Sequence, residues 1–227
     1  MATKQGARAR RHYGGRTAEE RAGQRRERLL QAALELFGTQ GYSATSIEQL
    51  CSAASISTRS FYEEMSSREQ LLIALADDLI GRAVAAGLAE IDAAAELPLA
   101  ERIARGVRAY LQITCRTPGS ARVCYIEVVG VSDAVERWRA EWRKRIGALL
   151  QGEAERAVWP RPGRAPGGPA GGRGGGGGGG HYGLFAISVM GAVNSLAQEL
   201  ARHDPESPLT LDDICAEIGT LIGAGVA

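Results

Sequence analysis

The sequence has few of the residues that build metal centres, disulfide frameworks and nucleophilic active sites. Its 227 residues include four cysteines and three histidines, and none of them shows metal-ligand spacing. The thiols of Cys51, Cys115, Cys124 and Cys215 each lie in an apolar helical context. We therefore expect buried free thiols in a reducing compartment, with no cofactor and no metal site.

The chain also lacks a long apolar run. No stretch approaches the roughly 18 residues that cross a membrane, and the N-terminus has no apolar signal core. Aromatic content is only 5%, whereas alanine and leucine dominate, which favours helices over strands. We expect an all-α cytoplasmic protein that makes no membrane contact and holds one or two domains.

No excess of either charge marks the chain as a whole, because its net charge is +1. The distribution is uneven, since residues 1–68 hold 11 Lys and Arg against 7 Asp and Glu, and residues 69–227 hold 16 against 19. A basic N-terminal part is typical of a nucleic-acid-binding module. Residues 1–16 form a basic arm without an acid, which either adds phosphate contacts or is a solvated, disordered tail.

The stretch Thr45–Gln70 has the pattern of two short helices joined by a tight turn, followed by the start of a third. Thr45 and Glu48 have capping-box spacing, after which apolar residues recur every three or four positions. The pattern breaks at residues 55–57, and Ser57 is placed to cap the next helix.

The second of these helices presents a polar face. It opens with Thr-Arg-Ser at residues 58–60, whereas Phe61 and Met65 are spaced to turn inward and Tyr62 lies on the flank. This arrangement is typical of a helix-turn-helix, whose second helix enters the major groove of DNA. An ordinary helical hairpin is the alternative, but the coincidence of capping signals and a polar outer face favours the DNA-binding motif.

Helical patterns continue on both sides of this motif. Thr17 and Glu20 have capping-box spacing and begin a helix whose arginines we expect to be exposed, and Gly41 suits the left-handed residue after it. Residues 121–129 could form a strand, but no partner strand is available, so we expect a buried helix. The expected helices cover residues 18–38, 67–89, 98–116, 121–129, 132–158 and 181–203, with a last one from 207 or 210.

Residues 160–180 are a low-complexity segment with 12 glycines and four prolines. We expect a flexible loop here, and its chance matches to a nucleotide-binding glycine motif lack the flanking strand and helix. The two apolar helices after it have little of their own chain left to cover them. We expect them to form a two-fold dimer interface, although burial within one subunit is the alternative.

Four segments resemble the TetR family of transcriptional regulators: residues 29–37 (LLQAALELF), 41–47 (GYSATSI), 54–62 (ASISTRSFY) and 67–72 (SREQLL). The resemblance is specific over residues 17–75. It implies about nine helices, a DNA-binding domain over residues 17–66, a ligand-binding and dimerisation domain over residues 67–227, and a homodimeric repressor released from a palindromic operator by a small molecule. The family usually has glycine where this chain has Ser55, which can adopt the needed backbone angle at a modest cost.

The resemblance also implies which residues meet double-stranded DNA. Arg59 is expected to donate a bidentate pair to guanine, worth roughly 1–3 kcal/mol of discrimination, and Arg68 to clamp a phosphate. Glu63 and Glu64 are unusual near a phosphate backbone, and we expect them to face away or to limit non-specific affinity. The expected DNA-contacting residues are Thr45, Ser46, Ser57, Thr58, Arg59, Ser60, Tyr62 and Arg68.

The ligand pocket is expected among the middle helices. Glu127 is the most informative candidate, because a carboxylate in an apolar run needs a partner, either an arginine such as Arg105 or Arg122 or a cationic ligand. Plain core packing is the alternative for each candidate. The candidates are Tyr110, Cys124, Tyr125, Glu127, Trp138 and Trp142.

Two other functions compete with this interpretation. An enzyme is disfavoured, because the three histidines lie outside any metal or nucleophile motif and residues 130–134 miss the last glycine of a nucleophile elbow. A DNA-binding protein that recruits a partner without sensing a ligand is the second rival, and a C-terminal domain without a cavity would favour it.

Overall fold

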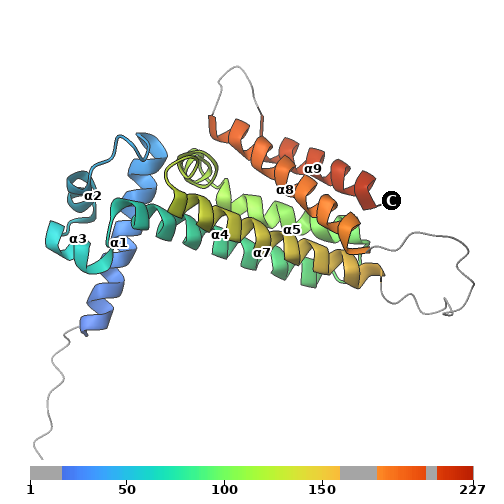
Figure 1. Ribbon diagram of the computed structural model, residues 1–227, viewed down its shortest axis with the longest axis horizontal. Coiled ribbons are helices and arrows are strands. Elements are labelled where there is room, and N and C mark those ends of the chain that lie inside the picture. Colours follow the sequence, from blue (N-terminus) through green and yellow to red (C-terminus); the bar gives the residue numbers. More distant parts are fainter. Residues whose placement is uncertain (1–16, 159–177, 203–208, 227) are drawn as a thin grey trace, which may run out of the picture.

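A computed structural model describes residues 17–158, 178–202 and 209–226, and all elements in these ranges are helical. Figure 1 shows α1–α3 gathered at one end of an elongated molecule, with α4 running from them into a larger helical domain. The all-α prediction is therefore confirmed. No helix in the described ranges is both long enough and apolar enough to cross a bilayer.

The small domain consists of α1 (Ala18–Thr39), α2 (Ile47–Ala54) and α3 (Thr58–Glu64). The predicted capping box of Thr17 and Glu20 begins α1, and Gly41 follows it with φ +94°. Side chains from all three helices form the core of this domain and are at most 5% exposed: Leu29, Ala33, Phe37, Leu50, Cys51 and Phe61.

The larger domain begins with α4 (Arg68–Ala93), which packs along α5 (Leu99–Thr114). After α6 (Pro118–Arg122), the π-helical turn η1 (Val123–Glu127) leads toward α7 (Asp133–Val158). The chain ends with α8 (Gly178–Arg202) and α9 (Leu211–Val226). The latter two helices pack on each other, α7 packs on α8, and α9 also covers α5.

The expected helix boundaries need several corrections. The helix after the DNA-binding motif continues to Ala93, and Pro98 is the N-cap of α5 rather than its first residue. Pro118 begins α6, because Thr117 caps a new helix there. The run at residues 121–129 is helical as expected, but most of it is a π-turn. Two cysteines, Cys115 and Cys215, are only partly buried.

The glycine-rich segment ends earlier than expected, because α8 already begins at Gly178. The rest of the expected flexible loop, and the basic arm at residues 1–16, lie outside the described residues.

The two domains meet where the end of α1 touches α6. A Cβ atom added to Gly38 would lie 2.7 Å from the Cα atom of Gly119, so the two backbones pack directly against each other. A side chain larger than hydrogen does not fit at Gly38.

Candidate nucleic-acid interface and ligand cavity

The helix α3 is fixed by its cap and its buried face. The Oγ atom of Ser57 accepts a hydrogen bond from the amide of Ser60 at 3.1 Å, and the two hydroxyls lie 3.0 Å apart. Phe61 and Met65 are 0% and 1% exposed. The expected cap is therefore confirmed, and the Ser60 hydroxyl is hydrogen-bonded to the Ser57 hydroxyl within the same helical turn.

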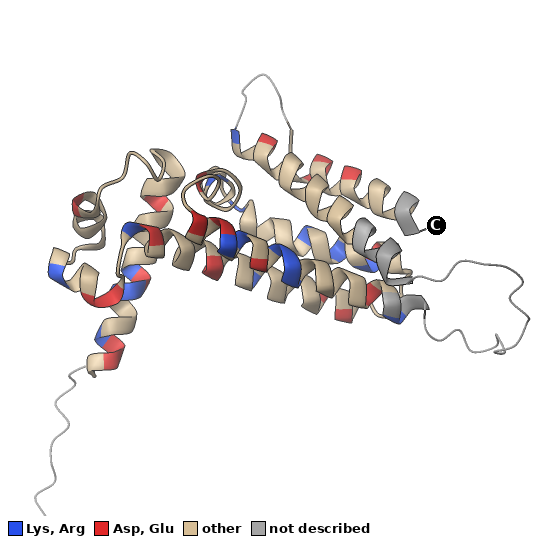
Figure 2. Ribbon diagram, in the orientation of Figure 1, with Lys and Arg blue, Asp and Glu red and all other residues tan. Residues whose placement is uncertain are grey.

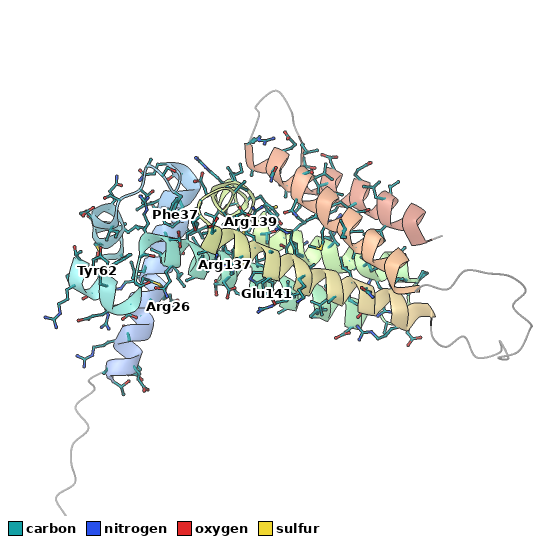
Figure 3. The ribbon with its side chains drawn as sticks, viewed as in Figure 1. Arg26, Phe37, Tyr62, Arg137, Arg139 and Glu141 are labelled. Carbon is teal, nitrogen blue, oxygen red and sulfur yellow. The ribbon has the colours of Figure 1, made fainter. Side chains whose placement is uncertain are left out.

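The opposite face of α3 is open to solvent. Thr58, Arg59, Tyr62 and Glu63 are all exposed, and Tyr62 points outward from the helix (Figure 3). Three of these residues are predicted DNA contacts. Glu63 was expected either to face away from DNA or to limit non-specific affinity, and it shares this exposed surface.

The turn before α3 has the backbone that the helix-turn-helix requires. Ser55 adopts φ 53° and ψ 51°, the left-handed conformation in which glycine is usually found. Its carbonyl oxygen accepts a hydrogen bond from Arg28 at 3.4 Å. The turn is thus kept with serine in the glycine position.

The start of α2 differs from the expectation by one residue. Ser46, not Thr45, is the N-cap, and it forms a capping box with Gln49 rather than with Glu48. Thr45 is 0% exposed, and its hydroxyl donates to the carbonyl of Gly41 at 2.7 Å. The hydroxyl of Thr45 therefore holds the loop together in this structure and does not face outward, whereas Ser46 stands at the helix N-terminus.

Arg68 lies at the start of α4 and contacts the small domain. Its guanidinium stacks 4.4 Å from the ring centroid of Tyr42, and it donates a hydrogen bond to the carbonyl of Thr45. Cation–π stacking and this hydrogen bond place a positive charge next to the α2 N-terminus. The predicted phosphate clamp thus also holds the loop before α2.

Arginines of α1 hold the motif from behind, contrary to the expectation that they are all exposed. Arg25 pairs with Glu64 at 2.7 Å, and the Glu64 side chain is only 12% exposed. The spacing within α1 did not reveal this pair, because its partner lies 39 residues away. The signal available was an acid at the end of a helix that is expected to enter the DNA groove.

An apolar cavity of about 130 Å³ lies inside the larger domain. Its walls come from α4, α5, η1, α7 and α8, and they are mostly aliphatic and aromatic. Five of the six residues predicted for the ligand pocket lie on these walls: Tyr110, Cys124, Tyr125, Trp138 and Trp142. That they contact a ligand stays a prediction.

Burial controls the chemistry of this wall. It raises the pKa of Tyr110, Tyr125 and Cys124, so all three are neutral and protonated at physiological pH. The Tyr125 and Thr114 hydroxyls lie 2.8 Å apart in a hydrogen bond. The tryptophans face Asp77, whose Oδ1 atom accepts from the indole of Trp138 at 2.9 Å and of Trp142 at 2.8 Å.

Glu127 does not line the cavity, which corrects its assignment to the pocket. Its carboxylate accepts a hydrogen bond from the amide of Tyr42 at 2.6 Å and from Arg122 at 2.7 Å. Arg122 in turn donates to the carbonyl of Thr39 at 2.7 Å. The arginine partner was among those expected, whereas the alternative partner Arg105 pairs with Glu101. Glu127 therefore joins the two domains.

A buried carboxylate that we did not predict, Glu153, lies on the cavity wall formed by α7. The Glu153 side chain is 2% exposed and pairs with Arg102 at 2.7 Å, and Arg156 also contacts it. Glu153 continues the apolar stripe of Ile146 and Leu150 along α7. An acid on an apolar helix face was the sequence signal that could have revealed it.

A helix-turn-helix with an open polar recognition helix, joined by α4 to a helical domain with an apolar cavity, defines a class of DNA-binding regulators. Residues 29–75 match the profile of the bacterial regulatory proteins of the tetR family. Over these residues, the chain is similar to the transcriptional regulators of this family.

Individual relatives agree with this assignment. The chain is 28% identical to the HTH-type transcriptional regulator EthR of Mycolicibacterium smegmatis over 153 residues, which are 65% of this chain and 69% of that protein. It is 38% identical to the HTH-type transcriptional regulator TcmR of Streptomyces glaucescens over 48 residues, 21% of each chain. The structure of FadR from Bacillus subtilis in complex with stearoyl-CoA has the same fold, with a TM-score of 0.68 at 14% identity over 88% of this chain and 97% of that one.

Proposed function

We propose that the protein is a homodimeric, cytoplasmic repressor that binds a palindromic operator and leaves it when a small molecule fills the cavity of the larger domain. The observation that carries this proposal is the combination of an exposed recognition face on α3 with an apolar cavity that reaches η1. The cavity favours ligand sensing over the rival in which the protein only recruits a partner. The relatives are regulators, which favours regulation over catalysis.

The proposed dimer uses α8 and α9. Ile187 on α8 is 66% exposed and Leu221 on α9 is 47% exposed, and these helices carry few charged residues in their described parts (Figure 2). Exposed aliphatic side chains on neighbouring helices are typical of an interface that a second copy covers. Ile187→Arg should give a monomer that binds a half-site weakly, and a monomeric wild type in sedimentation at micromolar concentration would contradict the dimer.

The cavity favours an elongated, mostly apolar ligand. Its wall on α7 runs from Trp138 to Glu153, a distance of about 22 Å along a helix. Polar groups stand at both ends, because Arg139 lies on the wall near the DNA-binding domain (Figure 3) and Glu153 lies at the far end. The stearoyl-CoA bound to FadR makes long-chain acyl thioesters the first compounds to test.

The free volume suggests how such a ligand would act. An engineered apolar cavity of about 150 Å³ accommodates benzene, so the present cavity of about 130 Å³ is too small for a long chain. Because the pocket is also partly open, a longer ligand either extends out of it or pushes its walls apart. Cys124 and Tyr125 belong both to the wall and to η1, whose last residue, Glu127, holds the loop of Tyr42.

The decisive experiment selects bound sequences from random DNA with the full-length protein. We expect a palindrome whose half-sites are centred one helical turn apart, about 34–36 Å. Adding acyl-CoA thioesters of increasing chain length should then release the DNA, and Val107→Phe, which fills the cavity, should weaken this response while DNA binding persists. Selection of no common sequence would reject the proposed function.

A further inference from the structure

The DNA-facing surface of α3 contains a carboxylate that has no structural task inside the protein. The neighbouring Glu64 is held against α1 by Arg25 and is largely buried. The Glu63 side chain is 50% exposed, and it forms an ion pair with Arg59 on the same face of the same helix. Figure 2 shows the basic residue at the beginning of α3 and acids at its end.

The Arg59–Glu63 pair is not needed to hold α3 in place. Its atoms Nε and Oε1 lie 3.1 Å apart, and the Arg59 side chain is 89% exposed. Solvent-exposed pairs of this kind contribute little to stability, whereas Phe61 and Met65 anchor the helix in the core. The pair can therefore rearrange at low cost when DNA approaches.

The chemistry of the two side chains matches one base pair or two neighbouring ones. Guanine offers N7 and O6 as acceptors in the major groove, which suit arginine, and cytosine offers its N4 amino group as a donor, which suits a carboxylate. A carboxylate that found no donor in the groove would remain close to phosphates of the same charge, which lowers affinity.

We propose that Glu63 is a base-reading residue that accepts a hydrogen bond from the N4 amino group of a cytosine, while Arg59 donates to the guanine of the same or the adjacent base pair. This inference rests on the proposed function, because it requires α3 to enter the major groove. It assigns Glu63 a direct role in specificity, in place of general repulsion of DNA.

The experiment compares wild type, Glu63→Gln, Glu63→Ala and the control Glu35→Gln as full-length proteins. The DNA is the palindrome selected by wild type, with each base placed in turn at each half-site position, and binding is measured by fluorescence anisotropy at one salt concentration. The control removes the same charge from an exposed position on α1. Thermal melting checks that every variant is folded.

Wild type should prefer cytosine at one position of each half-site by roughly 5- to 150-fold, the range that a good side-chain–base pair provides. Glu63→Gln should shift this preference to adenine, because an amide pairs with adenine N6 and N7. Glu63→Ala should abolish it, and Glu35→Gln should leave it unchanged.

Other outcomes overturn the inference. If Glu63→Gln and Glu63→Ala strengthen binding to every duplex equally and keep the base preferences of wild type, Glu63 acts only by repulsion. If wild type itself distinguishes no sequences, the proposed function fails first and the reading role fails with it. A wild type that reads DNA selectively without a cytosine preference that depends on Glu63 rejects this inference alone.

Discussion

The carboxylate of Glu127 accepts a hydrogen bond from the backbone amide of Tyr42 at 2.6 Å, although the two residues are 85 positions apart. Arg122 completes this junction by bonding both the carboxylate and the carbonyl of Thr39. The junction thus ties η1, which borders the cavity, to the loop between α1 and α2 that carries the cap Ser46.

Removing the charge at this junction should destabilise the protein. In Glu127→Gln, two charge-assisted hydrogen bonds weaken at a site where the side chain is only 11% exposed, and we expect a loss of about 1.5–3 kcal/mol. Urea unfolding measures it. The control Glu101→Gln breaks a pair whose side chains are both 51% exposed and should cost less than about 0.5 kcal/mol. Equal effects of the two substitutions would refute the role of the junction in stability.

Two glycines separate the effect of backbone strain on stability from the effect of a close contact at the junction. Gly41 and Gly130 both have positive φ, +94° and +70°, so alanine at either site should cost about 1–2 kcal/mol from the backbone alone. A Cβ at Gly41 would also lie 2.9 Å from Arg122 Nη2, whereas a Cβ at Gly130 meets no atom within 4 Å. Gly41→Ala should therefore lower the free energy of unfolding more than Gly130→Ala. The reverse order would contradict the close contact.

Glycine in the turn should stabilise the DNA-binding domain. Ser55 pays a steric cost for its left-handed backbone, and Ser55→Gly removes it, although the unfolded chain gains freedom. We expect a net gain of about 0.5–1 kcal/mol in thermal or urea unfolding, with Ser55→Ala close to wild type. A destabilised glycine variant would show that the hydroxyl of Ser55 contributes to the fold.

The two arginines of the interface should differ in their effects on DNA binding. Arg59→Ala should bring the affinity for the selected operator down toward that for a scrambled duplex. Arg68→Ala should weaken binding to both duplexes alike and reduce the salt dependence of binding by about 1 in slope, as expected for one lost phosphate contact. Because Arg68 also stacks on Tyr42, the melting temperature must be measured in parallel. Equal losses on both duplexes for Arg59→Ala would remove it from base recognition.

The thiol of Cys115 should react slowly at neutral pH. Burial raises the pKa of Cys115 to about 11, and only the thiolate is nucleophilic. At pH 8 its alkylation by iodoacetamide should be on the order of a hundredfold slower in the folded than in the unfolded protein. The rate should keep rising up to pH 11.

For the same reason, this thiol favours the folded state below the pKa of an unfolded cysteine and loses that contribution as pH rises toward 11. Mass spectrometry of peptides at several pH values follows the reaction, and a plateau near pH 9 would contradict the shift.

The helix-turn-helix could be predicted well because its signals are local. Ser57, the break at residue 55 and the inward spacing of Phe61 and Met65 lie within a few positions of each other. The choice between Thr45 and Ser46 as the cap could not be made locally, because both residues can cap. Burial of Thr45 against the Gly41 carbonyl decides it.

The larger domain was harder to predict, because its informative contacts are distant in sequence. Glu127 was recognised as a carboxylate that needs a partner, but it was grouped with Cys124 and Tyr125 as a pocket residue because all three lie in one apolar run. These residues form a π-turn, in which Glu127 faces Tyr42 while the other two face the cavity. Glu153 and Arg102, 51 positions apart, carry no shared local pattern.

The contact between Gly38 and Gly119 fixes the point about which α1 can rotate relative to α6. Two backbones that touch directly cannot absorb a movement by changing side-chain rotamers, so a rotation of α6 passes straight into α1. The arm from this pivot to Arg25, which grips α3 through Glu64, is 13 residues, or about 20 Å. A turn of about 5° would carry the recognition helix nearly 2 Å sideways, about half of the 3.4 Å that separates successive nucleotides along a DNA strand.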